Sequence, residues 1–581
     1  MAKFFSNKEI ANLFRTISAA YAISGKDYFK QIAYDRAADS IEHATSELKD
    51  LWDDGKLDTV PGLGKSMQGH IDELFKTGKV KHFEDLKEKL PPGMFELLNL
   101  QGLGPKTAYK LAKELKIKSV ADLEEAAKSH KIEKIPGFGQ KTEEDILSSI
   151  AEYKGKSTRF VLPLAFSTAQ RAIDYMRQIK ESERVEPLGS LRRMVATIGD
   201  VDIAVATSDP KKVIDHFTKF REVGRILGSG QTASSVVLKN GIQVDLKVQP
   251  PEAFGALLQH FTGSKNHNIH LREYALKKGF SLSEYGIKTK GKIKKFAKEE
   301  DFYNFLGMDW MEPELREDTG EIEAAQKHQL PKLAKLEDIK GDIHLHSSYP
   351  IEPSHDLGAD TFEQITKKAK SLGYKYIGLS DHSPGVSSHT PQQIIDLIKK
   401  RTKTIDELKS SQKSVQILNL LEIDILTNGQ LSVPEEGLKI LDGAIAGIHS
   451  GHSQDKKTIT ARLLTAINSP YVQVISHPTG RLLLQRESYQ VDWSQIFAAC
   501  KKTGTILEIN AWPNRLDLPD TLVKDAIKAG VKLVINSDSH AIDQMDNMKF
   551  GVSVARRGWA TAADIINTLP WLEFRKYFRV R

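Results

Sequence analysis

The chain has almost no cysteine and no long apolar run, and each absence excludes a class of protein. Its single cysteine, Cys500, excludes an intramolecular disulfide and is typical of a reducing cytoplasm. No stretch approaches the ~18 consecutive apolar residues that span a membrane. The first residues, Met-Ala-Lys-Phe-Phe-Ser-Asn-Lys-Glu, lack the apolar segment of a signal peptide. We therefore expect a cytoplasmic protein without a membrane partner.

An acidic excess is lacking too, because 83 Lys and Arg stand against 76 Asp and Glu, for a formal net charge of +7. This charge permits nucleic-acid binding but does not establish it, since a surplus of surface lysine is common. The 581 residues are 40% hydrophobic and 27% charged. That composition is typical of an ordinary globular protein, and the length allows about four domains.

Two aspartates, Asp200 and Asp202, are the first candidates for catalysis. They follow the run Gly189-Ser190-Leu191-Arg192-Arg193. We expect a strand over 198–207 in which both aspartates project from one face, because side chains alternate along a strand. The other face is apolar enough to be buried. Carboxylates this close repel unless a cation lies between them, and paired Mg²⁺ ions are the usual device for phosphoryl transfer.

A third aspartate, Asp245, fits the same site. In 242–248 the apolar residues share one face and Asp245 projects from the other. Two neighbouring strands would then gather three carboxylates on one sheet surface. Ordinary surface acids on an exposed strand edge are the alternative reading of a lone Asp-x-Asp. The Gly-Ser-x-Arg-Arg run upstream favours a nucleotidyltransferase palm.

A glycine element occurs three times in the first 155 residues, which otherwise have helical periodicity. Each copy couples Gly-x-Gly to a helix start and a lysine. The residues are Gly62, Gly64 and Lys65; Gly102, Gly104 and Lys106; Gly137, Gly139 and Lys141. Glycine permits close approach to a ligand, and a helix N-terminus offers N–H groups to a phosphate. One copy would indicate only a turn between helices, but three favour helix-hairpin-helix modules that bind the DNA backbone rather than bases.

Six short apolar segments beyond Gly341 each end in histidine or an acid. Parallel strands of a β/α barrel bring their C-terminal ends to one rim. Imidazole with carboxylate suits Zn²⁺, Mn²⁺ or Fe²⁺ better than Mg²⁺ alone. One histidine at a strand end is usually structural, but six agreeing ends favour a metal centre of two or three ions. The candidate ligands are His344, His346, His382, Glu422, His449, His477, Asp538 and His540.

Both motif sets, in this order, resemble the bacterial and archaeal family X DNA polymerases (DNA polymerase beta-like) that carry a C-terminal polymerase-and-histidinol-phosphatase (PHP) domain. The resemblance covers nearly the whole chain. It implies an all-α helix-hairpin-helix N-terminal region, an α+β nucleotidyltransferase palm with a nucleotide-selection subdomain, and a C-terminal α/β PHP barrel of distorted TIM type. The expected parts are a lyase-like DNA-binding domain at 1–90, a hairpin subdomain at 91–155, the palm at 156–250, nucleotide selection at 251–316, a linker at 317–338 and the PHP domain at 339–581.

The resemblance also implies roles in nucleotide addition. Asp200, Asp202 and Asp245 would bind two Mg²⁺ ions. The incoming nucleotide and the template strand beside it would be contacted by Ser190, Arg193, Gly199, Phe261, Gly263, Asn268, Arg272 and Arg159. Among these, Ser190 and Arg193 would hold phosphates, Phe261 and Gly263 would line the sugar pocket at an expected turn, Asn268 would face the base and Arg272 the template.

Three positions depart from the family pattern. His260 replaces the usual tyrosine before Phe-Thr-Gly-Ser, which concerns discrimination between deoxy- and ribonucleotides. His70 replaces the lyase lysine of eukaryotic relatives, and an imidazole cannot form the Schiff base that an amine forms, unless Lys65 or Lys79 takes that role. The loop 349–356 replaces Tyr-Ser-Asp-Gly, so a ninth metal ligand would come from Glu352, His355 or Asp356.

We expect a repair enzyme with two active sites: a gap-filling DNA-directed DNA polymerase and a PHP-domain 3′-5′ exonuclease. An endonuclease at abasic sites or a 3′-phosphatase is a further expectation for the barrel. The alternatives are a PHP phosphoesterase tethered to DNA by a weakly active polymerase half, and a non-enzymatic DNA-end scaffold. The expected partners are gapped or nicked duplex DNA and dNTPs. The expected ions are Mg²⁺ in the palm and Mn²⁺ or Zn²⁺ in the barrel, and the expected state is a monomer.

Overall fold

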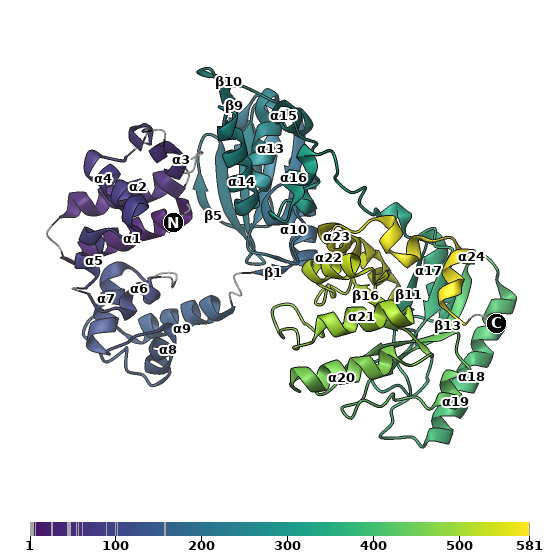
Figure 1. Cartoon of the computed structure of the whole chain (residues 1–581). Helices are drawn as coiled ribbons and strands as arrows, with labels where there is room; N and C mark the ends of the chain where they lie inside the picture. The colour runs from purple at the N-terminus through teal and green to yellow at the C-terminus, as the bar shows by residue number, and fades with distance from the viewer. Residues whose placement is uncertain are drawn as a thin grey trace. The chain divides into compact units, whose positions relative to one another are not determined.

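The computed structural model describes Phe5 and residues 7–24, 27–42, 48–53, 55, 57–60, 62–88, 90–98, 100, 103–155 and 159–579. The chain divides into two compact units, Met1–Thr158 and Arg159–Arg581 (Figure 1). None of the helices in the described part combines the length and the apolar character needed to cross a bilayer.

The first unit is helical over its described residues, as the periodicity predicts. Residues such as Ile10, Phe14 and Ile17 recur at helical spacing and are fully buried. Two separate apolar cores form, one from the first five helices and one centred on the last four. The helices are α1 (Asn7–Ser24), α2 (Tyr28–Glu42), α3 (Leu48–Asp53), α4 (Lys65–Thr77), α5 (Lys81–Lys87), α6 (Gly93–Leu97), α7 (Pro105–Glu114), α8 (Val120–Lys128) and α9 (Gln140–Gly155).

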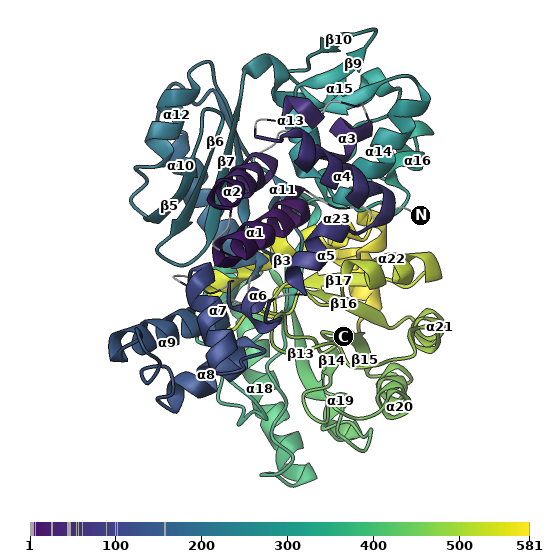
Figure 2. The ribbon, with the colours of Figure 1, turned by 90° about the vertical axis from the view of Figure 1, so that its left-hand side faces the viewer.

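The second unit begins with a five-stranded mixed sheet in the order β2-β4-β7-β6-β5. One face packs against α10 (Leu162–Met176) and α12 (Pro210–Phe217), and the other against α13 (Phe254–Thr262) (Figure 2). The strands are β2 (Arg184–Pro187), β4 (Val201–Ala206), β5 (Val223–Ser229), β6 (Ala233–Leu238) and β7 (Gln243–Gln249). Both faces of β4 are therefore buried.

The strand expected over 198–207 is divided into two. Its first part, β3 (Thr197–Ile198), pairs with β1 (Phe160–Val161) in a separate two-stranded sheet. The second part is β4, and Gly199 with Asp200 forms the bend between them. The prediction of one continuous strand was wrong because the two parts pair with different strands. Ile198 pairs with Phe160 of β1, whereas Val201 pairs with Val244 of β7. Between β2 and β3 lies the short helix α11 (Gly189–Arg192).

A smaller α/β subdomain follows the sheet. It contains α13, α14 (Lys265–Lys277), α15 (Glu299–Leu306), α16 (Glu321–Gln326) and the antiparallel strands β8 (Ser281–Ser283), β9 (Gly286–Thr289) and β10 (Lys292–Lys294). Phe261 and Thr262 close helix α13, so the expected turn is confined to Gly263 and Ser264.

The stretch 317–338, expected to be a linker, packs against the smaller subdomain and the barrel. Helix α16 belongs to that subdomain's core through Ile322 and Ala325. Buried Glu321 accepts a 2.7 Å hydrogen bond from the ring of His267 on α14. Ala334 is fully buried, and its amide donates to the Ala560 carbonyl. These contacts hold the segment 317–338 in place, although its charged composition is typical of a linker.

The C-terminal region is a parallel sheet of seven strands in sequential order. They are β11 (Gly341–Leu345), β12 (Tyr376–Leu379), β13 (Gln416–Asp424), β14 (Gly443–Gly447), β15 (Val472–Ile475), β16 (Ile506–Asn510) and β17 (Leu533–Asn536). A parallel bridge from Leu345 to Ser539 brings the two edges together into a nearly closed barrel. The seven strands are mostly apolar and almost entirely buried, because helices cover the outside.

The helices around the barrel are α17 (Phe362–Ser371), α18 (Pro391–Ser411), α19 (Glu435–Leu438), α20 (Lys456–Ile467), α21 (Trp493–Thr503), α22 (Asp520–Ala529), α23 (Met548–Arg557) and α24 (Trp571–Phe574). Several begin at a side-chain cap, as where Thr390 accepts from the Gln393 amide at the start of α18. Because every strand runs in the same direction, the C-terminal ends of the strands meet at one rim.

A buried charged triad joins the sheet to the smaller subdomain. Glu299 on α15 accepts from Arg192 at 2.9 Å and from Arg316 at 2.6 Å. Burial alone would raise the pKa of Glu299, but Arg316 and Arg192 hold it well below its usual value. The carboxylate also accepts from the Trp310 indole at 2.9 Å. Its charge is therefore fully compensated.

We expect Glu299→Ala to destabilise this junction by ~3–5 kcal/mol, because it leaves two buried guanidinium groups without a counter-charge. Hydrogen exchange over 254–316 measures the loss locally. The control is Glu222→Ala, which removes the partly exposed partner of Arg171 and should cost ~0–1 kcal/mol. Equal exchange rates in the two variants would contradict the importance of the triad.

Candidate active sites in the palm and the barrel

Two of the three palm aspartates lie side by side. Strands β4 and β7 are parallel, and Asp202 is the register partner of Asp245. Gly189, with φ of +56°, makes room for them, because a Cβ there would lie 2.5 Å from Asp202 Oδ2. The side-chain amide of Gln243 donates to both oxygens of Asp245, at 3.1 and 3.0 Å. Neighbouring strands thus place two half-buried acids together, as the sequence predicts.

Asp200 stands in the bend just before β4. Among the described residues, oxygens from Asp200, Asp202 and Asp245 do not all lie within 4.8 Å of one another. Two ions share such ligands only through bridging carboxylates. Their joint role in metal binding stays a prediction.

Arg193, expected to hold nucleotide phosphates, has protein partners in this structure. Its Nε donates to Glu317 Oε1 at 2.9 Å, and its Nη1 donates to the Thr262 carbonyl at 2.5 Å. The same Glu317 oxygen accepts from Arg557 on barrel helix α23 at 2.9 Å. Arg557 also donates to the Arg193 carbonyl. One carboxylate therefore links the palm arginine to the barrel.

The other predicted nucleotide contacts occupy varied positions. Asn268 is tied to α13, since its amide donates to the His260 carbonyl at 2.8 Å and its oxygen accepts from Gln259 at 2.9 Å. The Arg159 guanidinium donates to Thr197 Oγ1 at 2.8 Å on β3. The Lys247 ammonium lies 5.4 Å from the centroid of the Phe261 ring. Ser190 lies on α11, Gly199 directly precedes Asp200, Gly263 caps α13 and Arg272 lies on α14.

His260 stands where the family pattern has tyrosine. Burial, followed by the charges of Arg272 and Lys247, lowers its pKa to about 3. The imidazole is therefore neutral near pH 7. It contacts the Phe261 ring, with the ring centroids 4.7 Å apart. A neutral, half-buried ring beside Phe261 preserves an uncharged wall at the predicted sugar pocket.

The glycines of the three hairpin elements fall into two groups, those with a positive φ and those with open space around them. Gly62 and Gly137 adopt φ of +83° and +87°, which a turn requires and a side chain would strain. Gly64, Gly104 and Gly139 directly precede α4, α7 and α9, and a Cβ on any of them would meet nothing within 4 Å. The protein itself does not demand glycine at these three exposed positions, so an external ligand is the better reason. Gly102 lies outside the described residues.

The lysines of these elements lie in the first turn of each helix. Lys65 is the first helical residue, and Lys106 and Lys141 are the second residues of α7 and α9. All three are exposed. Positive charge next to unpaired helix N–H groups suits a phosphodiester.

His70 is packed into an aromatic cluster. Its ring stacks on His82 at 5.2 Å and lies 5.0 Å from Phe83. Burial, followed by the charge of His82, lowers the pKa of His70. This packed imidazole cannot act as the amine nucleophile of a lyase. The candidate amines, Lys65 and Lys79, are exposed.

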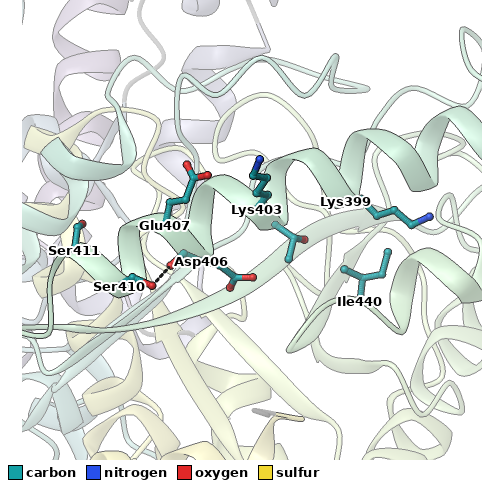
Figure 3. Close-up of a pocket in the computed structure, with 8 residues that line it drawn as sticks. Lys399, Lys403, Asp406, Glu407, Ser410, Ser411 and Ile440 are labelled. Carbon is teal, nitrogen blue, oxygen red and sulfur yellow. Dashed lines mark hydrogen bonds between the residues drawn. The ribbon is translucent and has the colours of Figure 1, made fainter.

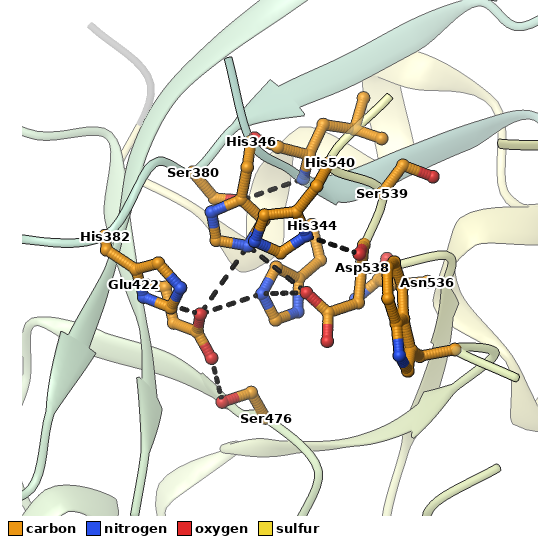
Figure 4. Close-up of polar contacts among 12 residues, drawn as sticks. His344, His346, Ser380, His382, Glu422, Ser476, Asn536, Asp538, Ser539 and His540 are labelled. Atoms are coloured by element: carbon orange, nitrogen blue, oxygen red, sulfur yellow. Dashed lines mark hydrogen bonds and ion pairs between the residues drawn. The ribbon is translucent and has the colours of Figure 1, made fainter. Parts of the chain in front are cut away.

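The barrel rim gathers all eight predicted metal ligands. Figure 4 shows His344, His346, His382 and His540 pointing toward Glu422 and Asp538. Glu422 Oε2 lies 3.1 Å from His344 Nε2 and 3.1 Å from His382 Nδ1. Asp538 Oδ1 lies 3.2 Å from His346 Nε2. His449 and His477 approach Glu422 Oε1 at 3.3 and 2.9 Å.

Several imidazole nitrogens in this cluster have no protein hydrogen-bond partner. The buried atoms are His344 Nε2, His346 Nδ1 and Nε2, His382 Nδ1, His477 Nδ1 and His540 Nε2. Burying such groups unpaired is costly, whereas a metal ion satisfies them. Burial would raise the pKa of Glu422, but His344 and His449 hold it well below its usual value. The donor set therefore fits ions that accept both imidazole and carboxylate.

Two acids that support the cluster were missed at the sequence level. Glu508, on β16, accepts from His344 Nδ1 at 2.7 Å and from the His477 amide at 2.8 Å. Asp424 binds His449 Nδ1 at 2.6 Å. Each contact occupies Nδ1 and leaves Nε2 for a metal, which is the usual orientation of a ligand histidine. The signal was present: Asp424 lies two residues after Glu422, and Glu508 lies within an apolar strand.

The loop 349–356 brings two residues to the rim. Asp356 places its oxygens 3.7 Å from His382 Nε2 and 3.5 Å from His540 Nε2. His355 Nε2 lies 3.2 Å from Asp424. Glu352 instead binds His389 at 2.8 Å. Of the three candidates for a ninth ligand, His355 and Asp356 therefore reach the rim and Glu352 does not, and the role of each stays a prediction.

A cavity of about 280 Å³ opens onto the cluster. Its lining combines the ligands with His355, Asp356, His452, Leu482, Arg486, Trp512 and Arg515. A second hollow of about 760 Å³ lies along α18, lined by residues such as Lys399, Lys403, Asp406 and Glu407 (Figure 3). The α18 hollow has charges of both signs and no histidine. The chemistry therefore belongs to the smaller cavity.

Comparison with known families gives three matches. The DNA polymerase beta thumb matches residues 257–317. A SAM-like helix-hairpin-helix tandem matches 95–152, and a helix-hairpin-helix domain matches 5–80. These ranges cover the smaller subdomain of the second unit and most of the first unit.

Similar curated proteins cover nearly all of the chain. The DNA polymerase/3′-5′ exonuclease PolX of Bacillus subtilis is 35% identical over 564 residues, 96% of this chain and 97% of that protein. DNA polymerase lambda of Arabidopsis thaliana is 25% identical over 53% of this chain and 62% of its own length. A probable phosphatase of Thermoanaerobacter is 26% identical over 39% of this chain and 89% of its own.

The hairpin geometry predicts a binding defect without a folding defect. Gly104→Val with Gly139→Val should lower affinity for gapped duplex about tenfold or more, because branched side chains would block phosphates from the helix N–H groups. Titration of labelled gapped DNA at several salt concentrations measures it. The control is Gly228→Val in β5, another glycine with open surroundings. Unchanged affinity in the double variant would remove the hairpins from the binding surface.

Glu508→Gln should weaken Mn²⁺ binding about 10–100-fold, because the amide cannot fix His344 as the carboxylate does. Equilibrium dialysis with elemental analysis gives the affinity independently of turnover. Glu436→Gln, an exposed acid on α19, is the matched control. Equal Mn²⁺ affinity in both variants would show that Glu508 does not support the cluster.

Proposed function

The chain belongs to the family X DNA polymerases that carry a 3′-5′ exonuclease, and from that premise we propose that it fills short gaps during DNA repair and trims 3′ ends with its barrel. The polymerase proposal rests on the alignment of Asp202 with Asp245 across parallel strands. The nuclease proposal rests on the buried imidazole nitrogens that have no hydrogen-bond partner and that a metal ion would satisfy.

In the palm, Asp202 and Asp245 would hold Mg²⁺ with Asp200 from the adjoining bend. The bound ions would activate the primer hydroxyl and neutralise charge on the transferred phosphate. Gln243 keeps the Asp245 carboxylate oriented, and Gly189 leaves room for the ions' ligands.

Arg193 would hold the triphosphate of the incoming dNTP after releasing Glu317. A phosphate offers the guanidinium a charged acceptor comparable to the carboxylate that it now has. Arg557 remains to neutralise Glu317, which is 2.9 Å away. Exchange of partners therefore leaves no buried charge alone, and Ser190 at the start of α11 provides a further donor.

In the barrel, the eight rim residues, with Asp356, would hold two or three ions, for which we favour Mn²⁺ or Zn²⁺. Bound ions would supply hydroxide near neutral pH, because a metal ion strongly lowers the pKa of the water that it binds. Glu508 and Asp424 keep His344 and His449 in the tautomer that presents Nε2. The same site could remove a 3′-phosphate or cleave beside an abasic residue, and similarity to probable phosphatases favours the first of these.

Binding would be to the backbone of gapped or nicked DNA through the hairpins. Three copies of an open glycine before a helix support a sequence-independent contact with steep salt dependence. Lyase chemistry at His70 is not part of the proposal, because its packed, neutral ring lacks the required amine.

Asp245→Ala should abolish gap filling while leaving 3′-end degradation at the parent level, because it removes one carboxylate from the palm alone. His344→Ala with His346→Ala should do the reverse. Primer extension on a one-nucleotide gap and degradation of a labelled 3′ end, each with Mg²⁺ and Mn²⁺, measure both activities.

Both variants should bind gapped DNA with parent affinity, which serves as the folding control. Parent-level insertion by Asp245→Ala would overturn the palm assignment. Parent-level degradation by the double histidine variant would place the nuclease elsewhere.

A further inference from the structure

The cavity beside the metal cluster has a wall that metal binding does not explain. Among its described lining residues, Arg486 and Arg515 are the permanent cations, and Trp512 is the large aromatic side chain. None of the three is a predicted metal ligand. A cationic pair and an exposed aromatic face are the two features by which proteins hold a nucleotide of a single strand.

The loop carrying Trp512 and Arg515 is fixed by hydrogen bonds. The Trp512 amide donates to Asn510 Oδ1 at 2.9 Å, where β16 ends. The Arg515 amide donates to the Trp512 carbonyl at 2.8 Å. Arg481 donates from its Nε to the Arg515 carbonyl at 2.9 Å. The side chains of Trp512 and Arg515 are therefore presented from a preorganised turn, which lowers the cost of binding.

Trp512 and Arg515 both stand next to metal ligands. The Trp512 ring lies edge-on to His540, with centroids 5.6 Å apart and planes at 74°. Arg515 Nε lies 3.8 Å from Asp538 Oδ2, and 19% of the side chain is exposed. A phosphate bound to the ions through Asp538 and His540 would thus have a guanidinium on one side and an indole beside it.

Arg486 reaches the cavity from a different segment. Its Nε donates to the Gly480 carbonyl at 2.9 Å, and its backbone pairs with Leu482 in a tight turn. The charge of Arg486, together with burial, lowers the pKa of nearby His452 to about 4. His452 is therefore neutral near pH 7. The lining thus combines two arginine charges with an uncharged imidazole.

We propose that Trp512, Arg486 and Arg515 form a subsite for the terminal nucleotide, so that the barrel binds a nucleotide more tightly than a bare phosphate. The terminal base would stack on Trp512, and the two arginines would hold the phosphate at the ions. A cavity of about 280 Å³ admits one nucleotide of a strand but no base pair. This inference rests on the proposed exonuclease and names its substrate.

Two substrates test the role of Trp512: an oligonucleotide with a normal 3′-terminal base and the same strand ending in an abasic residue. Trp512→Ala should raise KM for the normal end about tenfold, because one base–aromatic stack is lost. It should leave KM for the abasic end and kcat for both within twofold. Trp512→Phe should retain most of the preference, since a smaller ring still stacks.

Arg486→Ala tests the phosphate contact. KM should rise about tenfold for both strands. The slope of log affinity against log salt concentration should fall by about one, as expected when one phosphate contact is lost. Lys403→Ala removes a cation from the same barrel at the separate α18 hollow and should change neither. Bound Mn²⁺ must match the parent in every variant, because a lost ion would produce the same defects.

Direct binding separates failure of the subsite from failure of the proposed nuclease. By calorimetry with Mn²⁺, deoxythymidine 5′-monophosphate should bind the parent about tenfold more tightly than inorganic phosphate, and Trp512→Ala should remove that difference. Equal binding of the two ligands by the parent overturns the inference, whether or not the protein degrades DNA. Equal losses on normal and abasic ends in Trp512→Ala, with Mn²⁺ retained, also overturn it. Parent protein that binds the nucleotide preferentially but degrades no strand would support the subsite and refute the exonuclease.

Discussion

The barrel is organised around buried imidazole and carboxylate groups that satisfy one another only in part. Glu422 and Asp538 lie 3.1–3.6 Å from the ring nitrogens of His344 and His346, yet both rings keep buried nitrogens without a hydrogen-bond partner. Such a cluster is costly in a dry interior unless cations occupy it. The parallel strands, the supporting acid Glu508 and the covering loops all position these groups before any ion arrives.

One carboxylate connects the proposed nucleotide site of the palm with a helix on the outside of the barrel. Glu317 accepts from Arg193 in the palm and from Arg557 on barrel helix α23. The triad around Glu299 holds the adjoining subdomain to the same palm segment through Arg192. In the proposed function, nucleotide binding at Arg193 would therefore act on a group that also contacts a barrel helix, and the exposed helix ends of the hairpin unit would contact DNA.

Much of this architecture is predictable from the sequence, because two local patterns occur several times. Apolar segments end in histidine or an acid, and Gly-x-Gly elements precede helices. The eight rim ligands and the aspartates of β4 and β7 follow from strand periodicity. Strand β16 and Glu508 were missed because no histidine marks that strand end. The helix at 321–326 was missed because its anchor is a distant histidine, His267, and the bend at Gly199 depends on pairing with β1. These features follow from contacts between segments far apart in sequence, which local patterns do not contain.

The central claim is that the barrel rim is a centre for several ions held by imidazole and carboxylate. A crystal of the full chain grown with Mn²⁺, with anomalous scattering recorded at the manganese edge, tests it most directly. We predict two or three peaks among His344, Glu422, His449 and Asp538, each within coordination distance of both ligand types. A map with no peak at the rim, or with manganese only at the palm aspartates, would contradict the account.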